Sequence, residues 1–244
     1  MKHTLAMKKV LVTGGTRGIG RALAETLSQR GCEVMVCGRS RAALTEVERS
    51  LGVRTVRCDV TSAADIAALR SAVQGELCGL DLLVNNAGLQ LEHDLVDALD
   101  VEAARRETEV NLLAPMLVTD ALLPLLLAAP DAAVVNVTSA LALAPAPRAP
   151  VYSAAKAGLS AYTHALRAQL AESTVRVVEV VPPLTRTAMT AGRDDGAVEP
   201  QVVAEAIARG LERGKQRLVI GKARALSAIF RVSPALARCV MRGR

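Results

Sequence analysis

Short apolar runs alternate with helical segments along almost the whole of this 244-residue chain. The apolar runs are continuous rather than alternating in polarity, which is typical of strands covered on both faces. Segments of ten or more residues with helical character separate them, and this spacing indicates βαβ units with parallel strands. The sequence therefore predicts one α/β domain over 1–244: a doubly wound parallel sheet of about seven strands with helices on both faces, in three α/β/α layers.

The expected strands are 9–13, 33–37, 53–60, 81–85, 133–138, 175–181 and 217–220. The expected helices are 21–30, 41–50, 63–77, 101–128, 151–171 and 197–213. Pro115 and Pro124 lie inside the long helix, where proline removes a backbone donor, so we expect a kink or an interruption there. Two irregular segments, 140–150 and 182–200, follow strands on the side where open α/β sheets bind ligands.

The charge of the chain is unevenly distributed. Nine basic residues and no acidic ones follow Glu212, whereas residues 1–212 hold 21 basic and 24 acidic residues. A nucleic-acid-binding body would carry a basic patch, so no nucleic-acid partner is expected. The basic tail, 222–244, has the pattern of two short amphipathic helices, with Ser233 as the cap of the second. Its composition permits weak contact with an anionic membrane surface, or packing over a substrate cleft or a subunit interface.

Cysteines, histidines and hydropathy narrow the class of protein further. The five cysteines have no C-x-x-C spacing, which indicates reduced thiols and a cytoplasmic location. The three histidines are scattered, so no metal site is expected. No stretch of about 18 residues is apolar and free of charge, and the first nine residues lack the apolar centre of a secretory signal. A membrane span is therefore not expected.

A glycine-rich turn, Thr13–Gly20, joins the first expected strand to the first expected helix. Gly14 and Gly18 allow a tight turn and a close approach to a pyrophosphate, and Gly20 allows the helix to pack closely on the sheet. The free N–H groups at the helix N-terminus attract phosphate. Because a strand precedes the turn and a helix follows it, the pattern indicates a dinucleotide site.

Tyr152 and Lys156 are four residues apart in an expected helix, so they share one face. An ammonium favours the phenolate, so Lys156 is expected to lower the pKa of Tyr152 and let it act as an acid and base near neutral pH. Such a pair alone is more often a core ring and a solvated amine. The Ser153-x-x-Lys156 spacing also fits penicillin-binding enzymes, but their other motifs are missing.

The spacing Gly-x-x-x-Gly-x-Gly, with 85–88 (Asn-Asn-Ala-Gly), Asn111, Ser139 and the Tyr152/Lys156 pair, resembles the short-chain dehydrogenase/reductase family. The resemblance covers the chain from about residue 8 to 221. It is to the single-domain branch of the family, whose members have about 250 residues. It implies a Rossmann-type fold and a homodimer or homotetramer. Pro182-Pro183 replaces the family's usual Pro-Gly, which resembles a bacterial subgroup similar to a protein of the D-alanylation operon.

The resemblance also implies residue roles. Tyr152 would exchange a proton with the substrate oxygen, and Lys156 would bind the nicotinamide ribose. Ser139 would hold the substrate oxygen and Asn111 a water, while Asp59 would accept a hydrogen bond from the adenine amine. The implied cofactor-binding set is Gly14, Thr16, Arg17, Gly18, Ile19, Gly20, Arg39, Asp59, Val60, Asn86, Ala87, Gly88, Tyr152, Lys156, Pro182 and Thr187.

The end of the second expected strand bears on the choice of cofactor. NAD-binding sites place a carboxylate there, but this chain has Cys37-Gly38-Arg39-Ser40. Arg39 and Arg17 could clamp a 2′-phosphate, so we expect NADP(H). The alternative is that both arginines are solvated surface groups.

The sequence thus predicts an NADP(H)-dependent oxidoreductase acting on a small-molecule carbonyl or secondary alcohol, with 184–200 as a substrate loop. The alternative is a catalytically silent dinucleotide-binding sensor or scaffold, which the presence of all four catalytic residues disfavours. A sugar-nucleotide epimerase is disfavoured by the short chain and the glycine spacing. Leu112, Leu113, Leu117 and the run 122–127 are expected in the core and a subunit interface.

Overall fold

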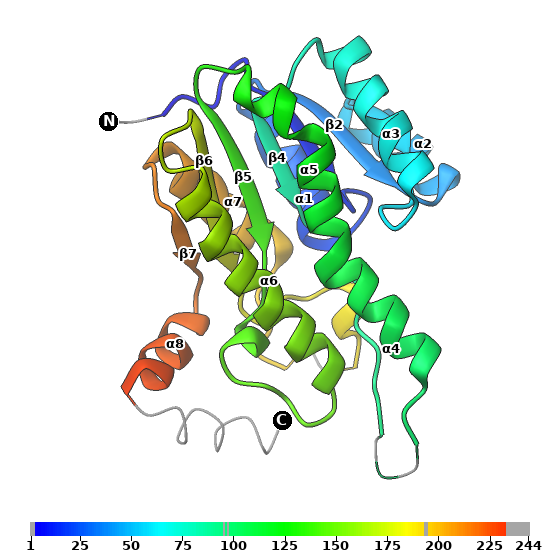
Figure 1. Ribbon diagram of the computed structural model, residues 1–244, viewed down its shortest axis with the longest axis vertical. Helices are drawn as coiled ribbons and strands as arrows, with labels where there is room; N and C mark the ends of the chain where they lie inside the picture. The colour runs from blue at the N-terminus through cyan, green and yellow to red at the C-terminus, as the bar shows by residue number, and fades with distance from the viewer. Residues whose placement is uncertain (1–2, 95, 97, 193–194, 233–244) are drawn as a thin grey trace.

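A computed structural model describes residues 3–94, 96, 98–192 and 195–232, and it contains a seven-stranded parallel sheet (Figure 1). The strand order is β3-β2-β1-β4-β5-β6-β7. The strands are β1 (Lys9–Thr13), β2 (Glu33–Gly38), β3 (Arg54–Arg57), β4 (Leu82–Asn85), β5 (Ala132–Val137), β6 (Val175–Val181) and β7 (Arg217–Val219). The direction of winding reverses between β1 and β4, and the carboxyl ends of these strands form the crevice where such sheets bind ligands.

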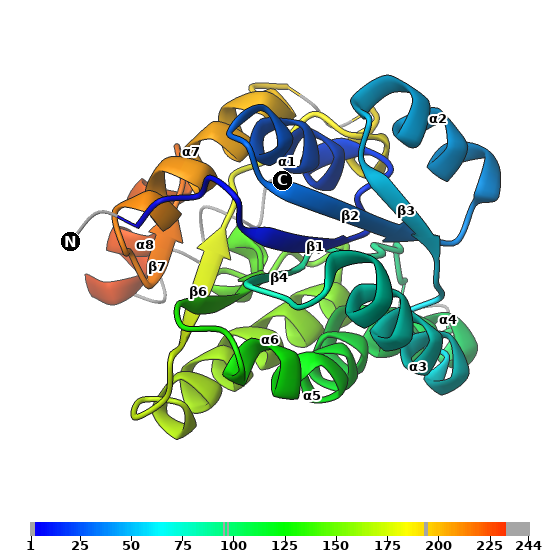
Figure 2. The same cartoon turned by 90° about the horizontal axis from the view of Figure 1, so that it is seen from above.

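Helices cover both faces of the sheet, which confirms the predicted three layers (Figure 2). One face carries α1 (Gly18–Gln29), α2 (Arg41–Leu51) and α7 (Pro200–Glu212). The other carries α3 (Ala63–Ala72), α5 (Ala114–Leu127) and α6 (Pro150–Gln169). A π-helical turn, η1 (Val73–Leu77), extends α3, while α4 (Val101–Thr108) precedes α5 and α8 (Ala223–Val232) follows β7.

The valine-rich strands are buried on both faces, as their continuous apolar runs predicted. Val10 and Val12 of β1 pack into the core cluster under α1 and α7, whereas Leu11 packs into the cluster under α3, α5 and α6. All six residues of β5 are buried. Two large apolar clusters therefore hold the sheet rigid beneath its carboxyl edge.

The regular α-helical hydrogen bonding of the predicted helix 101–128 is interrupted, but the interruption does not lie at its prolines. A π-helical turn, η2 (Glu109–Leu113), separates α4 from α5. Pro115 lies in the first turn of α5, where a missing N–H costs little, and α5 continues through Pro124. The predicted position of the interruption was therefore wrong.

Three of the element ends that differ from the prediction lie beside the carboxyl edge. The first helix begins at Gly18, so its first turn is formed by the glycine loop itself. The third strand ends at Arg57, which leaves Asp59 and Val60 in the loop beyond the sheet. The last helix before β7 begins at Pro200 rather than 197.

One helical stretch, Val101–Leu127, is long and apolar enough to span a membrane by length and composition, although the sequence predicted no such segment. Its side chains Val118, Leu122 and Leu126 are fully buried in the cluster against the sheet. Core helices of α/β domains meet the same test, so the apolar composition of this stretch is accounted for by packing.

Candidate active site

A cleft of about 520 Å³ opens at the carboxyl edge of the sheet. It brings together residues from the glycine loop, the ends of β2, β4 and β5, α6 and the loop after β6. The predicted cofactor residues that line it are Gly14, Thr16, Arg17, Gly18, Ile19, Arg39, Asp59, Val60, Asn86, Ala87, Gly88, Tyr152, Lys156, Pro182 and Thr187. Of the predicted set, Gly20 does not line the cleft and instead lies buried behind the loop.

The glycine loop is folded tightly against the end of β4. Gly14 has φ +64°, and a Cβ there would lie 2.8 Å from the Cα of Ala87. A Cβ at Gly20 would lie 2.5 Å from the carbonyl oxygen of Gly14. Both positions therefore exclude a side chain, and the loop backbone stays open to the cleft at the N-terminus of α1.

Thr13 and Asn86 fasten the two central strands together, a pairing that the sequence reasoning missed. The Thr13 hydroxyl accepts hydrogen bonds from the backbone N–H groups of Asn86 at 3.0 Å and Ala87 at 3.1 Å. The Asn86 side-chain amide donates to the carbonyl oxygens of Thr13 at 3.0 Å and Gly14 at 3.1 Å. The signal available in the sequence was Thr13 itself, because it places a hydroxyl on the last residue of a strand, directly before the glycine turn.

Arg17, Arg39 and Asp59 lie at the rim beyond β2 and β3. Both arginines are exposed, and both line the cleft. Asp59 accepts two hydrogen bonds at Oδ1, from the Thr61 amide at 3.0 Å and the Thr61 hydroxyl at 2.8 Å. Burial opposes ionisation of Asp59, but these bonds and the charge of Arg39 outweigh it and lower its pKa.

Tyr152 lies in the first turn of α6, buried, with its side chain hydrogen-bonded to that of Ser139. Burial raises the pKa of Tyr152 to about 12, against the lowering effect of the Ser139 hydrogen bond. Ser139 caps the short turn η3 (Ala140–Ala142), where its hydroxyl accepts from the Leu141 N–H at 3.1 Å. The structure therefore brings the predicted acid/base and its predicted partner together.

Lys156 is buried one turn along α6, and its Nζ lies 5.8 Å from the centre of the Tyr152 ring. The ammonium donates a hydrogen bond to the Val137 carbonyl oxygen at 2.9 Å. Burial lowers the pKa of Lys156 to about 8. The expectation that Lys156 lowers the pKa of Tyr152 is wrong for this structure, because desolvation of the phenol outweighs every favourable contact that it makes.

Asn111 lies in the π-helical turn η2 and is fully buried. Its amide nitrogen donates to the carbonyl oxygens of Leu89 at 2.5 Å and Glu107 at 2.9 Å. A Cβ at Gly88 would lie 3.2 Å from Asn111 Oδ1 and 3.9 Å from Lys156 Nζ. Asn111 and Lys156 therefore face the same glycine, although Asn111 does not itself line the cleft. Such turns are frequent at functional sites.

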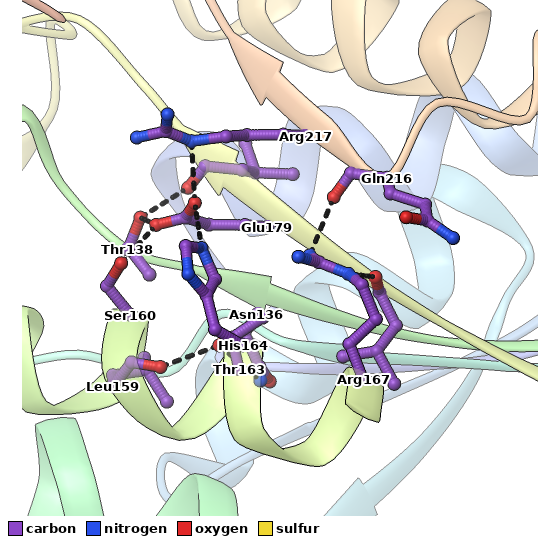
Figure 3. Close-up of polar contacts among 12 residues, drawn as sticks. Asn136, Thr138, Leu159, Ser160, Thr163, His164, Arg167, Glu179, Gln216 and Arg217 are labelled. Atoms are coloured by element: carbon purple, nitrogen blue, oxygen red, sulfur yellow. Dashed lines mark hydrogen bonds and ion pairs between the residues drawn. The ribbon is translucent and has the colours of Figure 1, made fainter. Parts of the chain in front are cut away.

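Glu179, in the middle of β6, is the centre of a polar network beneath the site (Figure 3). Its fully buried carboxylate accepts hydrogen bonds from Ser160 at 2.6 Å, Arg217 at 2.8 Å and Thr138 at 3.3 Å, and contacts His164 at 3.3 Å. Burial raises its pKa, but these partners outweigh burial and lower it overall. The signal that sequence reasoning missed is a single carboxylate in a run of valines, since a buried charge needs partners.

The predicted substrate loop, 184–200, is held against the glycine loop. Thr185 pairs with Val198, and Arg186 forms an ion pair with Glu199 at 2.8 Å. Thr187 caps the short turn η4 (Ala188–Thr190), and its Cγ2 would lie 3.0 Å from a Cβ at Gly18. Thr187 is therefore placed beside the first turn of α1.

The tail packs on the other side of the site. Ile229 and Phe230 of α8 lie against Leu141 and the buried Ala144 and Ala146, in the segment that follows Ser139. The predicted second tail helix and its Ser233 cap lie outside the described residues. The contacts of Ile229 and Phe230 favour packing of α8 on the fold over membrane contact.

The part of the chain that the structure describes contains no group of three or more His, Cys, Asp or Glu residues that could hold a metal ion. His93 is buried and paired with Glu107 at 2.8 Å, and His164 contacts Glu179. Both histidines therefore have structural partners.

Comparisons with known proteins agree with this geometry. The short chain dehydrogenase family matches residues 8–197. The uncharacterized oxidoreductase DltE of Bacillus subtilis is 37% identical over 219 residues, which cover 86% of each protein.

Three solved structures have the same fold. A short chain dehydrogenase from Burkholderia cenocepacia, in complex with NADP, has a TM-score of 0.88 at 29% identity and covers 98% of this chain and 99% of its own. A variant of actinorhodin polyketide ketoreductase with NADPH has a TM-score of 0.80 at 28% identity over 89% of this chain and 96% of its own. A relative from Burkholderia phymatum with NAD, at 20% identity and a TM-score of 0.86 over 94% and 93%, shows the fold alone. The chain therefore belongs to the short-chain dehydrogenase/reductase family of oxidoreductases.

Proposed function

We propose that this protein is an NADP(H)-dependent oxidoreductase that interconverts a small-molecule ketone or aldehyde and the corresponding alcohol. The observation that carries the proposal is the buried Tyr152 at one end of a cleft whose other end is a glycine loop, with Lys156 and the partly buried Ser139 beside it. Two side-chain hydroxyl donors close together are what a developing alkoxide needs.

The residues of the cleft fit a nicotinamide dinucleotide. The positive φ of Gly14, the exclusion of a side chain at Gly20 and the open N-terminus of α1 form a cradle suited to a pyrophosphate. When bound, the dinucleotide supplies or accepts the hydride. Asp59, Asn86 and Thr187 are proposed to contact it, together with the other cleft residues of the predicted set.

The side chains then divide the remaining work. In the reducing direction, Tyr152 Oη donates its proton to the substrate oxygen, and the Ser139 hydroxyl donates a hydrogen bond to the same oxygen. Because the pKa of Lys156 is about 8, this amine can gain or lose a proton near neutral pH. We propose that it returns a proton toward Tyr152, with Asn111 positioning the water that connects Lys156 to solvent.

The preference for NADP(H) rests on Arg17 and Arg39, which are exposed at the rim of the cleft. Their positive charges would attract a 2′-phosphate, whereas the carboxylate that NAD-binding sites place at this point would repel it. Two solved relatives contain NADP or NADPH, and a more distant one contains NAD. Michaelis constants for NADPH and NADH test the preference. We expect NADPH to be favoured and Arg39→Glu to reverse the order, and a wild-type preference for NADH would contradict the assignment.

The catalytic assignment is tested with a panel of ketones, aldehydes and secondary alcohols. Turnover of each compound is measured as oxidation or reduction of the nicotinamide. We expect Tyr152→Phe to reduce kcat by about 10²-fold or more on any active compound. Tyr162→Phe is the matched control. Full turnover by Tyr152→Phe would refute the mechanism. If wild-type protein binds the dinucleotide and turns over no compound of any class, the silent sensor or scaffold becomes the better assignment.

A further inference from the structure

Glu107 of α4 and His93, in the segment between β4 and α4, form a buried acid–histidine pair beside the cleft. The Glu107 side chain is 0% exposed and that of His93 is 2% exposed, and His93 Nε2 lies 2.8 Å from Glu107 Oε2. Every other residue of α4 is at least partly exposed. Because desolvation cancels much of the attraction within a buried pair of this kind, stability alone does not account for a carboxylate at this position.

The pair belongs to a row of contacts that holds residues 89–93, here called the strap, against α4 and η2 (Figure 1). The Leu91 N–H donates a hydrogen bond to Glu107 Oε1 at 2.8 Å. Four residues further along the helix, Asn111 Nδ2 donates to the Leu89 carbonyl oxygen at 2.5 Å, and Asn111 Oδ1 accepts from the Leu89 N–H at 3.3 Å. Alternate residues of the strap are therefore bound by two side chains that lie about one helical turn apart.

The strap borders the cleft at the end where the proposed catalytic groups lie. Gly88, the residue before the strap, is close to Lys156, since a Cβ on Gly88 would lie 3.9 Å from Lys156 Nζ. Leu89 lines the cleft. At the other end of the strap, the His93 N–H makes a long hydrogen bond of 3.5 Å to the Arg148 carbonyl oxygen, two residues before the start of α6. Both ends of the strap are therefore tied to segments that adjoin the proposed catalytic groups.

The charge of Glu107 also acts on the proposed acid and base. Burial is the main cause of the raised pKa of Tyr152, the hydrogen bond with Ser139 lowers it, and the negative charge of Glu107 raises it further. The acid–histidine pair is therefore coupled to the site by electrostatics as well as by the strap.

We propose that Glu107 and His93 are positioning residues, which clamp the strap to α4 and thereby fix the wall of the cleft beside the proposed catalytic groups. Neither residue lines the cleft, so both act through the strap. Without the clamp, Leu89 and Gly88 are free to move, and a displacement of about 1 Å in a reacting group can lower a rate by about 10²-fold. The effect on catalysis rests on the proposed function, whereas the clamp itself does not.

Glu107→Ala removes both contacts that the carboxylate makes with the strap. Hydrogen-exchange mass spectrometry should show faster exchange in peptides that cover 89–93, whereas peptides from β1 and β5 should keep their wild-type rates. On any compound that the wild-type protein turns over, kcat should fall by about tenfold or more. The dissociation constant of NADP⁺, measured by calorimetry, should be unchanged, because the proposed phosphate cradle lies at the other end of the cleft.

Three further variants complete the experiment. In Glu107→Gln the amide oxygen can still accept from the Leu91 N–H and the amide nitrogen can donate to a neutral His93 ring, so exchange and kcat should return most of the way to wild type. His93→Leu keeps the Leu91 contact and should lie between wild type and Glu107→Ala. Glu102→Ala, at an exposed residue of the same helix, is the matched control and should behave as wild type. Glu107→Gln and His93→Leu also decide the question if Glu107→Ala does not fold.

Wild-type exchange of the strap in Glu107→Ala would overturn the clamp, and faster exchange with an unchanged kcat would overturn the positioning role. Parallel losses of kcat and NADP⁺ binding that Glu107→Gln does not restore would show a general structural role and would also contradict the proposal. A wild-type protein that turns over no compound would instead refute the proposed function, and the exchange measurement would still test the clamp.

Discussion

At the scale of single residues, burial governs the electrostatics of Tyr152, the proposed acid and base. Tyr152, Ser139 and Lys156 lie together as their spacing predicted. The predicted direction of the shift in the Tyr152 pKa was wrong, because helical spacing does not reveal how deeply a pair of side chains is buried. Burial raises the pKa of the phenol to about 12 and lowers that of the amine to about 8.

The buried Lys156 predicts an unusual dependence of stability on pH. Its pKa is about 8 in the folded protein and 10.5 in the reference state, so the unfolded chain binds more protons between these values. The free energy of unfolding should therefore rise by about 2 kcal/mol between about pH 8 and 10, relative to Lys156→Met. Urea unfolding measures this difference, with Lys215→Met, at an exposed lysine, as the control. Parallel curves for wild type and Lys156→Met would contradict the buried charge.

At the scale of elements, strands and helices were predicted well, and their junctions were not. The break lies in the π-helical turn η2 rather than at Pro115 or Pro124, so the prolines of the same segment gave a false position for it. Glu179 was missed because its partners come from the residue after β5, from α6 and from β7, and no local pattern shows that these segments meet around one carboxylate.

The Glu179 network predicts stability that is lost in acid. The pKa of Glu179 is lowered from 4.5, so its stabilising effect is complete above that value and disappears as pH falls through the folded-state pKa. Glu179→Gln should cost about 2 kcal/mol at neutral pH, and its deficit relative to wild type should shrink in acid. Urea unfolding at both pH values, with Ser160→Ala as the partner variant, gives the measurement. A deficit that does not change with pH would show that the carboxylate charge is not what stabilises the network.

At the scale of the whole molecule, the parallel sheet, its three layers and the family were all predictable, because buried strands and the glycine turn impose local patterns. The surface was harder to interpret. Leu113, Leu117 and Leu127 are 45–50% exposed along η2 and α5, although most of their neighbours are core residues. Leu117 also borders a groove of about 510 Å³ that Ile66 and Ala67 of α3 help to line.

These exposed leucines predict that two copies associate through α5. We expect the protein to be a homodimer or homotetramer, and Leu117→Glu to weaken the association, because a charge would be buried in an apolar contact. Light scattering after size exclusion should then show a mass falling toward the 25.6 kDa of one chain. Met7→Glu, at an exposed residue before β1, should leave the mass unchanged. A monomeric wild type would contradict the assignment.

The most direct test of the account is the ionisation of Tyr152. The chain has two tyrosines and no tryptophan, so in Tyr162→Phe the ultraviolet absorbance of phenolate reports Tyr152 alone. At about pH 9 the phenol should be protonated without cofactor, since burial raises its pKa to about 12. With saturating NADP⁺ the phenolate signal should appear at that pH, because the cationic nicotinamide and Lys156 favour the anion, and it should be absent when Lys156→Met is added. No phenolate signal with saturating NADP⁺ would contradict the assignment of Tyr152 as the acid and base.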